Sequence, residues 1–178
     1  MRVRIAFAAL ALLFVGSCYF GYFLAEAFPE VAKKEIENIR DLLQNVSPRN
    51  LPPLLIFLII LINNSVKSFF AMILGIFFGI VPILFLFFNG IIIGFFAKLI
   101  GEKIGILVFI LLLLPHGIIE IPAVILACTY GFILGIEFVR DRKNIKKHLA
   151  NAIWNYLRFV LPMLVVAAFI ETALISIT

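Results

Sequence analysis

Charged residues are scarce in this sequence. Asp, Glu, Lys and Arg together make up 14% of its 178 residues, whereas they make up about a quarter of an ordinary soluble domain. Hydrophobic residues make up 64% of the chain. A chain of this length cannot bury so much apolar surface in its own core, so much of it must face lipid. The composition therefore predicts an all-α fold, a polytopic transmembrane helix bundle.

Cysteines and catalytic motifs are also few. The two cysteines, Cys18 and Cys128, both lie in apolar runs, where small hydrophobic side chains pack between helices. The sequence has no CxxC, GxSxG, HExxH or phosphate-binding loop, so we expect neither an enzyme nor a cofactor. The net charge of +5 does not indicate a nucleic-acid partner, because membrane proteins gather Lys and Arg on the cytoplasmic side of their spans.

The first apolar run, residues 5–28, predicts a transmembrane span. Arg2 and Arg4 precede it and place the N-terminus in the cytoplasm. Residues 15–18, VGSC, resemble a lipoprotein cleavage site, which would make the run a signal peptide. The apolar run continues well past Cys18, however, and its length suits a helix that crosses about 30 Å of hydrocarbon. We therefore favour the span.

Residues 29–48 predict an amphipathic helix outside the cytoplasm. Its apolar residues follow a four–three spacing and its other faces carry mixed charges. Pro29 can begin the helix and Pro48 ends it. Two roles remain open for it. It covers the bundle or the headgroups, which we favour, or it docks an extracytoplasmic partner protein.

Four further spans are predicted, and the order of charges orients them. Residues 140–155 form a basic amphipathic helix, which the charge rule places in the cytoplasm. The predicted spans cover residues 52–66, 68–88, 118–139 and 156–177. The chain is thus expected to lie in the cytoplasmic (inner) membrane, with its N-terminus inside and its C-terminus outside.

The N-terminus and the basic run are both predicted to be cytoplasmic, so an even number of crossings must separate them. The four spans predicted before the basic run already meet this condition. Residues 91–114 must therefore enter and leave the membrane on the same side. They contain two short apolar pieces separated by Gly101, Glu102 and Lys103. Each piece is shorter than the roughly 20 residues of a span, which predicts a re-entrant helical hairpin. Two tilted full crossings, which take in residues from either side, give the same parity and remain the alternative.

A row of small residues marks the helix predicted over residues 118–139. The residues recur every four positions, so they lie on one face and allow close approach of another helix. They are Ala123, Ala127, Gly131 and Gly135. We expect this face to contact protein, either within the subunit or across a homodimer or other homo-oligomer.

The most unusual polar residues of the chain are His116 and Glu120. Pro115 and Gly117 flank the histidine and predict a turn into the next helix, on which the two side chains lie one turn apart. Ionisable groups at such depth are costly and tend to mark function. The pair can bond to backbone groups that a helix break leaves free, it can relay a proton or cation, or it can bind a metal ion, although two ligands are few for a metal. Groups that could complete a relay are Lys98, Glu102 and Asn89.

Asparagines form the second polar feature. Asn63 and Asn64 lie near the end of the second predicted span, where amides bond across helices. Asn89-Gly90 predicts a turn after the third span. Glu171, in the last span, is expected to reach toward the outer interface.

The order of these motifs resembles the stage II sporulation protein M family. The resemblance covers roughly residues 50–177, and its most specific element is the PHGxxE sequence that begins at Pro115. The positions that match are Asn63, Asn64, Asn89, Gly90, Pro115, His116, Gly117 and Glu120. The resemblance implies an integral membrane protein of about five spans. It also implies, from the namesake, a scaffold that holds partner proteins at the membrane.

Two hypotheses of function follow. The first is a membrane scaffold that recruits membrane or extracytoplasmic proteins through its two amphipathic helices. The second is an ion or small-solute channel or transporter with a polar site at His116 and Glu120, for which prolines and short helices are typical. A polar cavity near His116 would favour transport, and dry packing would favour the scaffold.

Overall fold

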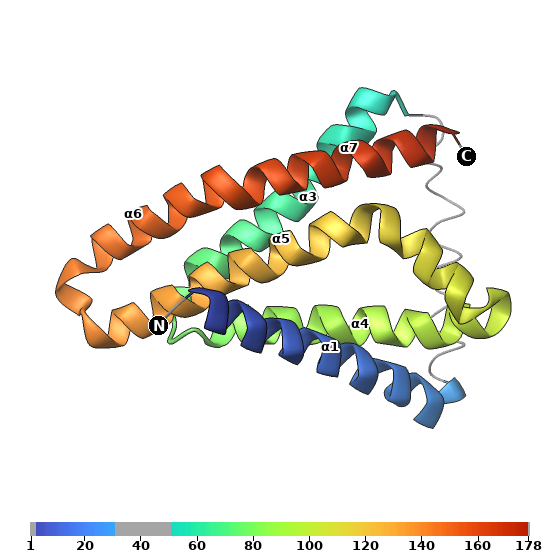
Figure 1. Cartoon of the computed structure of the whole chain (residues 1–178), viewed down its shortest axis with the longest axis horizontal. Helices are drawn as coiled ribbons and strands as arrows, with labels where there is room; N and C mark the ends of the chain where they lie inside the picture. The colour runs from blue at the N-terminus through green and yellow to red at the C-terminus, as the bar shows by residue number, and fades with distance from the viewer. Residues whose placement is uncertain (1–2, 31–50, 178) are drawn as a thin grey trace.

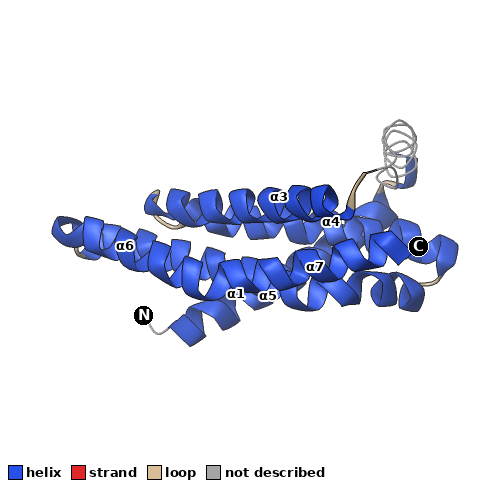
Figure 2. Cartoon of the chain, turned by 90° about the horizontal axis from the view of Figure 1, so that it is seen from above, coloured by secondary structure: helices blue, strands red, loops and turns tan. Residues whose placement is uncertain are grey.

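A computed structural model of the chain describes residues 3–30 and 51–177. This part of the chain contains helices and short turns and no strand, and five of its helices are long and apolar enough to cross a membrane (Figures 1 and 2). The all-α, multi-span fold expected from the composition is confirmed. The predicted amphipathic helix at 29–48 lies almost entirely outside the described residues.

Successive long helices run in opposite directions along the bundle (Figure 1). The N-terminus and the turns after α3 and α5 lie at one end, here called the N-terminal end. The C-terminus and the turn between α4 and α5 lie at the other, the C-terminal end. The helices are α1 (Val3–Ala27), α3 (Pro53–Ile73), α4 (Ile80–Ile104), α5 (Ile106–Arg140), α6 (Ile145–Asn155) and α7 (Leu161–Ile177).

The second and third spans have different bounds from those predicted. Lys67 does not end a helix: α3 continues through it to Ile73, and a short 3₁₀ turn, Leu74–Ile76, extends the span. The chain instead reverses at Phe77–Gly79, where Gly79 has φ 74°. Predicted spans at 52–66 and 68–88 were therefore wrong in their boundary. One lysine does not interrupt a helix, whereas glycine readily adopts the positive φ of this reversal.

The re-entrant hairpin predicted at 91–114 does not appear in the structure. Its first piece is the second half of α4, which runs without a break to Ile104 and is long enough to span. The chain turns at Gly105, φ 93°, and the second piece begins α5. The alternative of two additional full crossings does not appear either, because the second piece is a short first part of α5 and not a further span. Residues 80–90 belong to α4 rather than to the preceding span, and they give α4 its full length.

Apart from Arg140, which ends α5, and Asp141, the predicted cytoplasmic helix at 140–155 forms one continuous rod with the predicted span at 156–177 (Figure 1, orange to red). It runs from Arg142 to Ser176, 35 residues or about 50 Å, whereas about 20 residues cross a bilayer. A π-helical segment, Tyr156–Val160, joins α6 to α7, and the Leu161 N–H donates to the Tyr156 carbonyl within it. Pro162, which follows, has no N–H to donate.

Small residues determine how closely the helices pack. In the α1–α4 pair, a Cβ added at Gly21 or Gly94 would overlap the backbone of the opposite helix. α5 lies at the centre, in contact with α1, α3, α4 and α7. Its small residues all face protein within the subunit, and they are Ala123, Ala127, Gly131 and Gly135. Exposed large hydrophobic residues on every long helix form the surface that faces lipid.

Candidate intramembrane polar site

The asparagine pair lies in the middle of α3 rather than at its end. Asn63 is ten residues beyond Pro53, which places it about 15 Å from the start of the helix. Its side-chain amide donates to the Asn64 Oδ1 atom at 3.2 Å. Two amide side chains therefore stand near the middle of α3, after a first half that is wholly apolar.

A pocket of about 290 Å³ brings these asparagines together with two carboxylates. Asn63 and Asn64 come from α3, Glu120 from α5 and Glu171 from α7. The remaining lining residues, Ile59 and Ile60, are apolar. The family resemblance pointed to three of the four polar residues, whereas no sequence pattern joined Glu171 to them. The three helices converge only in the folded chain.

The pocket lies toward the C-terminal end of the bundle, and apolar side chains close it on the opposite side. Glu171 is six residues from the end of α7, or about 9 Å along the helix. Below the pocket, the three helices pack through fully buried apolar side chains that include Met72, Ala127 and Leu164. The polar residues thus line a limited space above a tightly packed core.

The chemistry of the lining suits a positive charge. Two carboxylates and two amides present oxygen atoms, which hard cations prefer as ligands, and none of the described lining residues is basic. Among the described residues, no group of three or more His, Cys, Asp or Glu side chains could hold a metal ion by itself.

Asn89 and Gly90 do not belong to this pocket. The Asn89 amide donates to the Phe85 carbonyl of its own helix at 2.7 Å. A Cβ at Gly90 would lie 2.6 Å from the Ser17 Cβ, so this glycine permits the close contact of α4 with α1. The predicted turn at Asn89-Gly90 was wrong, because α4 continues through both residues.

The predicted turn at Pro115–Gly117 was also wrong. α5 continues through both Pro115 and Pro122, although it bends near its start (Figure 1, yellow). Prolines are tolerated within membrane helices because neighbouring groups can satisfy the freed carbonyls. The His116 side chain lies outside the described residues, so its predicted partnership with Glu120 and its weak potential as a metal ligand stay predictions.

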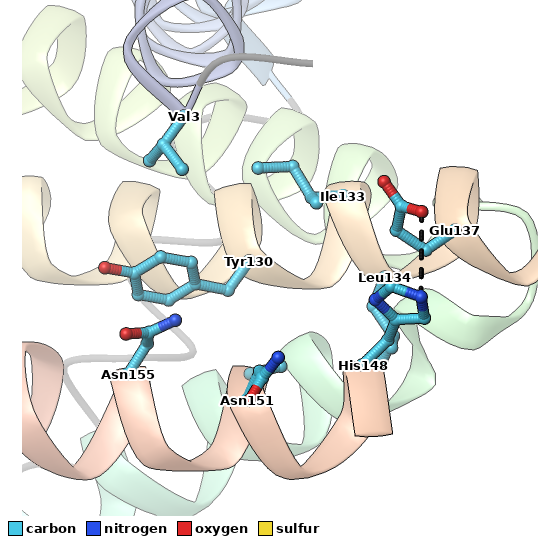
Figure 3. A pocket seen from close by; sticks show the side chains of 9 residues that line it. Val3, Tyr130, Ile133, Leu134, Glu137, His148, Asn151 and Asn155 are labelled. Carbon is cyan, nitrogen blue, oxygen red and sulfur yellow. Dashed lines mark ion pairs between the residues drawn. The ribbon is translucent and has the colours of Figure 1, made fainter. Parts of the chain in front are cut away.

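A second polar pocket, of about 190 Å³, lies at the N-terminal end between α5, α6 and the start of α1 (Figure 3). Its polar lining residues are Tyr130, Glu137, His148, Asn151 and Asn155. His148 Nε2 lies 3.1 Å from Asp141 Oδ2 and 3.8 Å from Glu137 Oε2. Hydrogen bonds from His148 and Asn144 lower the pKa of Asp141. Sequence reasoning missed this pocket, although Glu137 and His148 flank the basic run.

Between the two pockets, Tyr156 ties the rod to α3. Its hydroxyl donates to the Ser65 carbonyl at 2.9 Å and lies 2.9 Å from the Ser68 hydroxyl. Ser68 also donates to the Asn64 carbonyl at 2.7 Å. The tyrosine ring stacks edge-on against Phe69. These contacts fix the π-helical segment against the middle of α3.

Five long apolar helices with large hydrophobic side chains on their outer surfaces define a multi-pass integral membrane protein in contact with the lipid bilayer. No curated protein and no solved structure matches this chain. The model of one family, stage II sporulation protein M, matches residues 10–175. The chain belongs to that family, as the resemblance of its motifs indicated.

Proposed function

We propose that this protein binds a cation, a proton included, in the pocket of Asn63, Asn64, Glu120 and Glu171 and moves it across the membrane. The proposal rests on one observation: three helices bring four polar side chains, two of them acidic, into a single intramembrane pocket. Ionisable groups inside a bilayer cost several kcal/mol or more, and they tend to mark ion pathways. The role is that of a transporter and not of an enzyme.

The proposed orientation follows from the charges at the two ends. The basic segment after α5 lies at the N-terminal end together with Arg4, so this end is cytoplasmic under the charge rule. The pocket then opens in the outer half of the membrane. Because one chain is small, we propose that two or more copies form the complete pathway.

The test is cation flux into proteoliposomes that contain the purified protein. Gradients of protons, Na⁺ and K⁺ are imposed in turn, and the parent chain is compared with Glu120→Gln and Glu171→Gln. Each amide keeps the shape of the side chain and removes its charge, so flux should fall at least tenfold while the fold is kept. Glu26→Gln is the matched control, because Glu26 is exposed on α1 and Lys98 keeps its shorter contact to Glu102.

The scaffold role implied by the family's namesake is the opposing outcome. In that case the parent chain conducts none of the three cations, Glu120→Gln is silent, and Glu120→Leu destabilises the fold by removing a polar group from its bonding. Absence of flux from the parent chain would end the transport proposal. Flux that survives both glutamine variants would exclude this pocket as its route.

A further inference from the structure

The segment after α5 carries an unusual density of cations. Five of the eight residues from Arg140 to Lys147 are basic and exposed, and together they form what we call the basic collar. Its members are Arg140, Arg142, Lys143, Lys146 and Lys147. At the opposite end of the bundle, Lys98 is paired with acidic side chains: its Nζ atom lies 3.1 Å from Glu102 Oε1 and 3.6 Å from Glu26 Oε1.

The collar has no matching negative charge within the described chain. None of its five side chains forms an ion pair with another described residue. The two nearby acids are engaged elsewhere: Asp141 with Asn144 and His148, and Glu137 with His148. Only Arg142 has a described partner for its charge, the ring of Phe138 at 5.2 Å. The collar therefore presents cations that an anionic partner could neutralise.

The exposed side chains of the α6–α7 rod indicate where the collar lies relative to the membrane surface. Lys146 and Lys147 begin this face, and Trp154, with 65% of its surface exposed, follows seven residues or about 10 Å later. Large apolar side chains such as Phe159 and Phe169 are exposed further along the rod. Tryptophan favours the boundary between hydrocarbon and headgroups. With Trp154 at this boundary, Lys146 and Lys147 lie about 10 Å further from the hydrocarbon, at the depth of the lipid phosphates.

We infer that the basic collar binds the phosphates of anionic phospholipid headgroups. Arginine forks and lysine ammonium groups both pair with phosphate oxygens. Basic clusters that adjoin a membrane helix attract anionic lipids at about 1 kcal/mol per residue, or roughly fivefold in affinity. The continuity of the collar with the lipid-facing surface favours a lipid over a soluble anion. The inference is independent of the proposed cation transport.

The experiment measures the melting temperature of the full-length protein in neutral detergent micelles with increasing phosphatidylglycerol. Zwitterionic phosphatidylcholine and inorganic phosphate serve as parallel titrants. We expect phosphatidylglycerol to raise the melting temperature and the other two to have little effect. Lys146→Gln combined with Lys147→Gln should shift the half-saturating lipid concentration upward by about 25-fold. Lys103→Gln, at an exposed lysine on the opposite end of the bundle, should leave it unchanged.

Four results would overturn the inference. Equal stabilisation by the zwitterionic lipid would show that the collar does not recognise charge. Equal stabilisation by inorganic phosphate would assign the site to a soluble anion. An unchanged response of the Lys146/Lys147 variant, or an equal loss in the control variant, would place lipid binding elsewhere. Because the substituted side chains are exposed, the variants should fold, and circular dichroism before the titration confirms it.

Discussion

Replacing Tyr156 with Phe isolates the contribution of one hydroxyl to the stability of the bundle. Tyr156 is 2% exposed, and its ring contact with Phe69 would survive the change. The variant loses the 2.9 Å bond to the Ser65 carbonyl and the 2.9 Å contact with the Ser68 hydroxyl. Ser68 keeps its own bond to the Asn64 carbonyl, so no buried donor is stranded on α3.

The magnitude follows from these partners. Interhelical hydrogen bonds in membrane proteins contribute about 0.6 kcal/mol on average and about 1.7 at most. Because the variant gives up both hydroxyl interactions and leaves no new unsatisfied donor, Tyr156→Phe should lower the free energy of unfolding by about 1 to 2 kcal/mol. Tyr156→Leu also removes the aromatic pairing with Phe69 and should cost about 1 kcal/mol more.

The assay is reversible unfolding of the purified protein in mixed micelles with increasing sodium dodecyl sulfate. Tyr19→Phe is the matched control, because Tyr19 on α1 is 76% exposed and its hydroxyl should contribute little to stability. Equal effects of the two Tyr→Phe substitutions would refute the account of Tyr156 as a tie between the rod and α3. A loss above about 4 kcal/mol would refute the magnitude, since it would require repacking rather than a lost hydroxyl.

Three further tests address the packing, the orientation and the acid stability of the bundle. Gly131→Leu should unfold or strongly destabilise the chain, because even a Cβ would lie 2.7 Å from the Met72 carbonyl oxygen, whereas Gly16→Leu, with open space around it, should fold normally in the same assay. A cysteine at Lys103 should react with an impermeant thiol reagent added outside intact cells and one at Lys143 should not; the reverse pattern would invert the proposed orientation. Because its pKa is lowered in the fold, ionised Asp141 stabilises the protein above its ordinary pKa of 3.8, and this contribution is lost as the pH falls through the lower folded value. Asp141→Asn should therefore flatten the dependence of the unfolding midpoint on acid pH, and an unchanged profile would contradict this.

Composition and periodicity predicted the class of fold because they report how much surface must face lipid. They did not predict where helices end. A lysine such as Lys67 and prolines such as those of α5 are typical of helix boundaries, yet a continuous helix keeps nearly every backbone group bonded within the apolar region. The reversal at Gly79 depends on close packing of α3 and α5, which only the tertiary structure reveals.

Individual residues of the candidate site were predictable from the sequence, whereas their convergence was not. Glu120 and the asparagine pair stood out because polar residues are rare in such helices. Their convergence with Glu171 depends on the packing of α3, α5 and α7, and no spacing along the chain indicates it. Asn89 carried the same sequence signal and yet bonds within its own helix, which shows that a polar residue at mid-span need not belong to a shared site.

The rod from Arg142 to Ser176 carries four of the five collar residues at one end and Glu171 toward the other. Tyr156 is held to α3 near the middle of this rod, 14 residues from Arg142 and 15 residues from Glu171. The two arms are thus nearly equal, each about 21 to 23 Å long. The hydroxyl of Tyr156 thus fixes the rod to α3 at one buried point between its basic end and the end that carries Glu171.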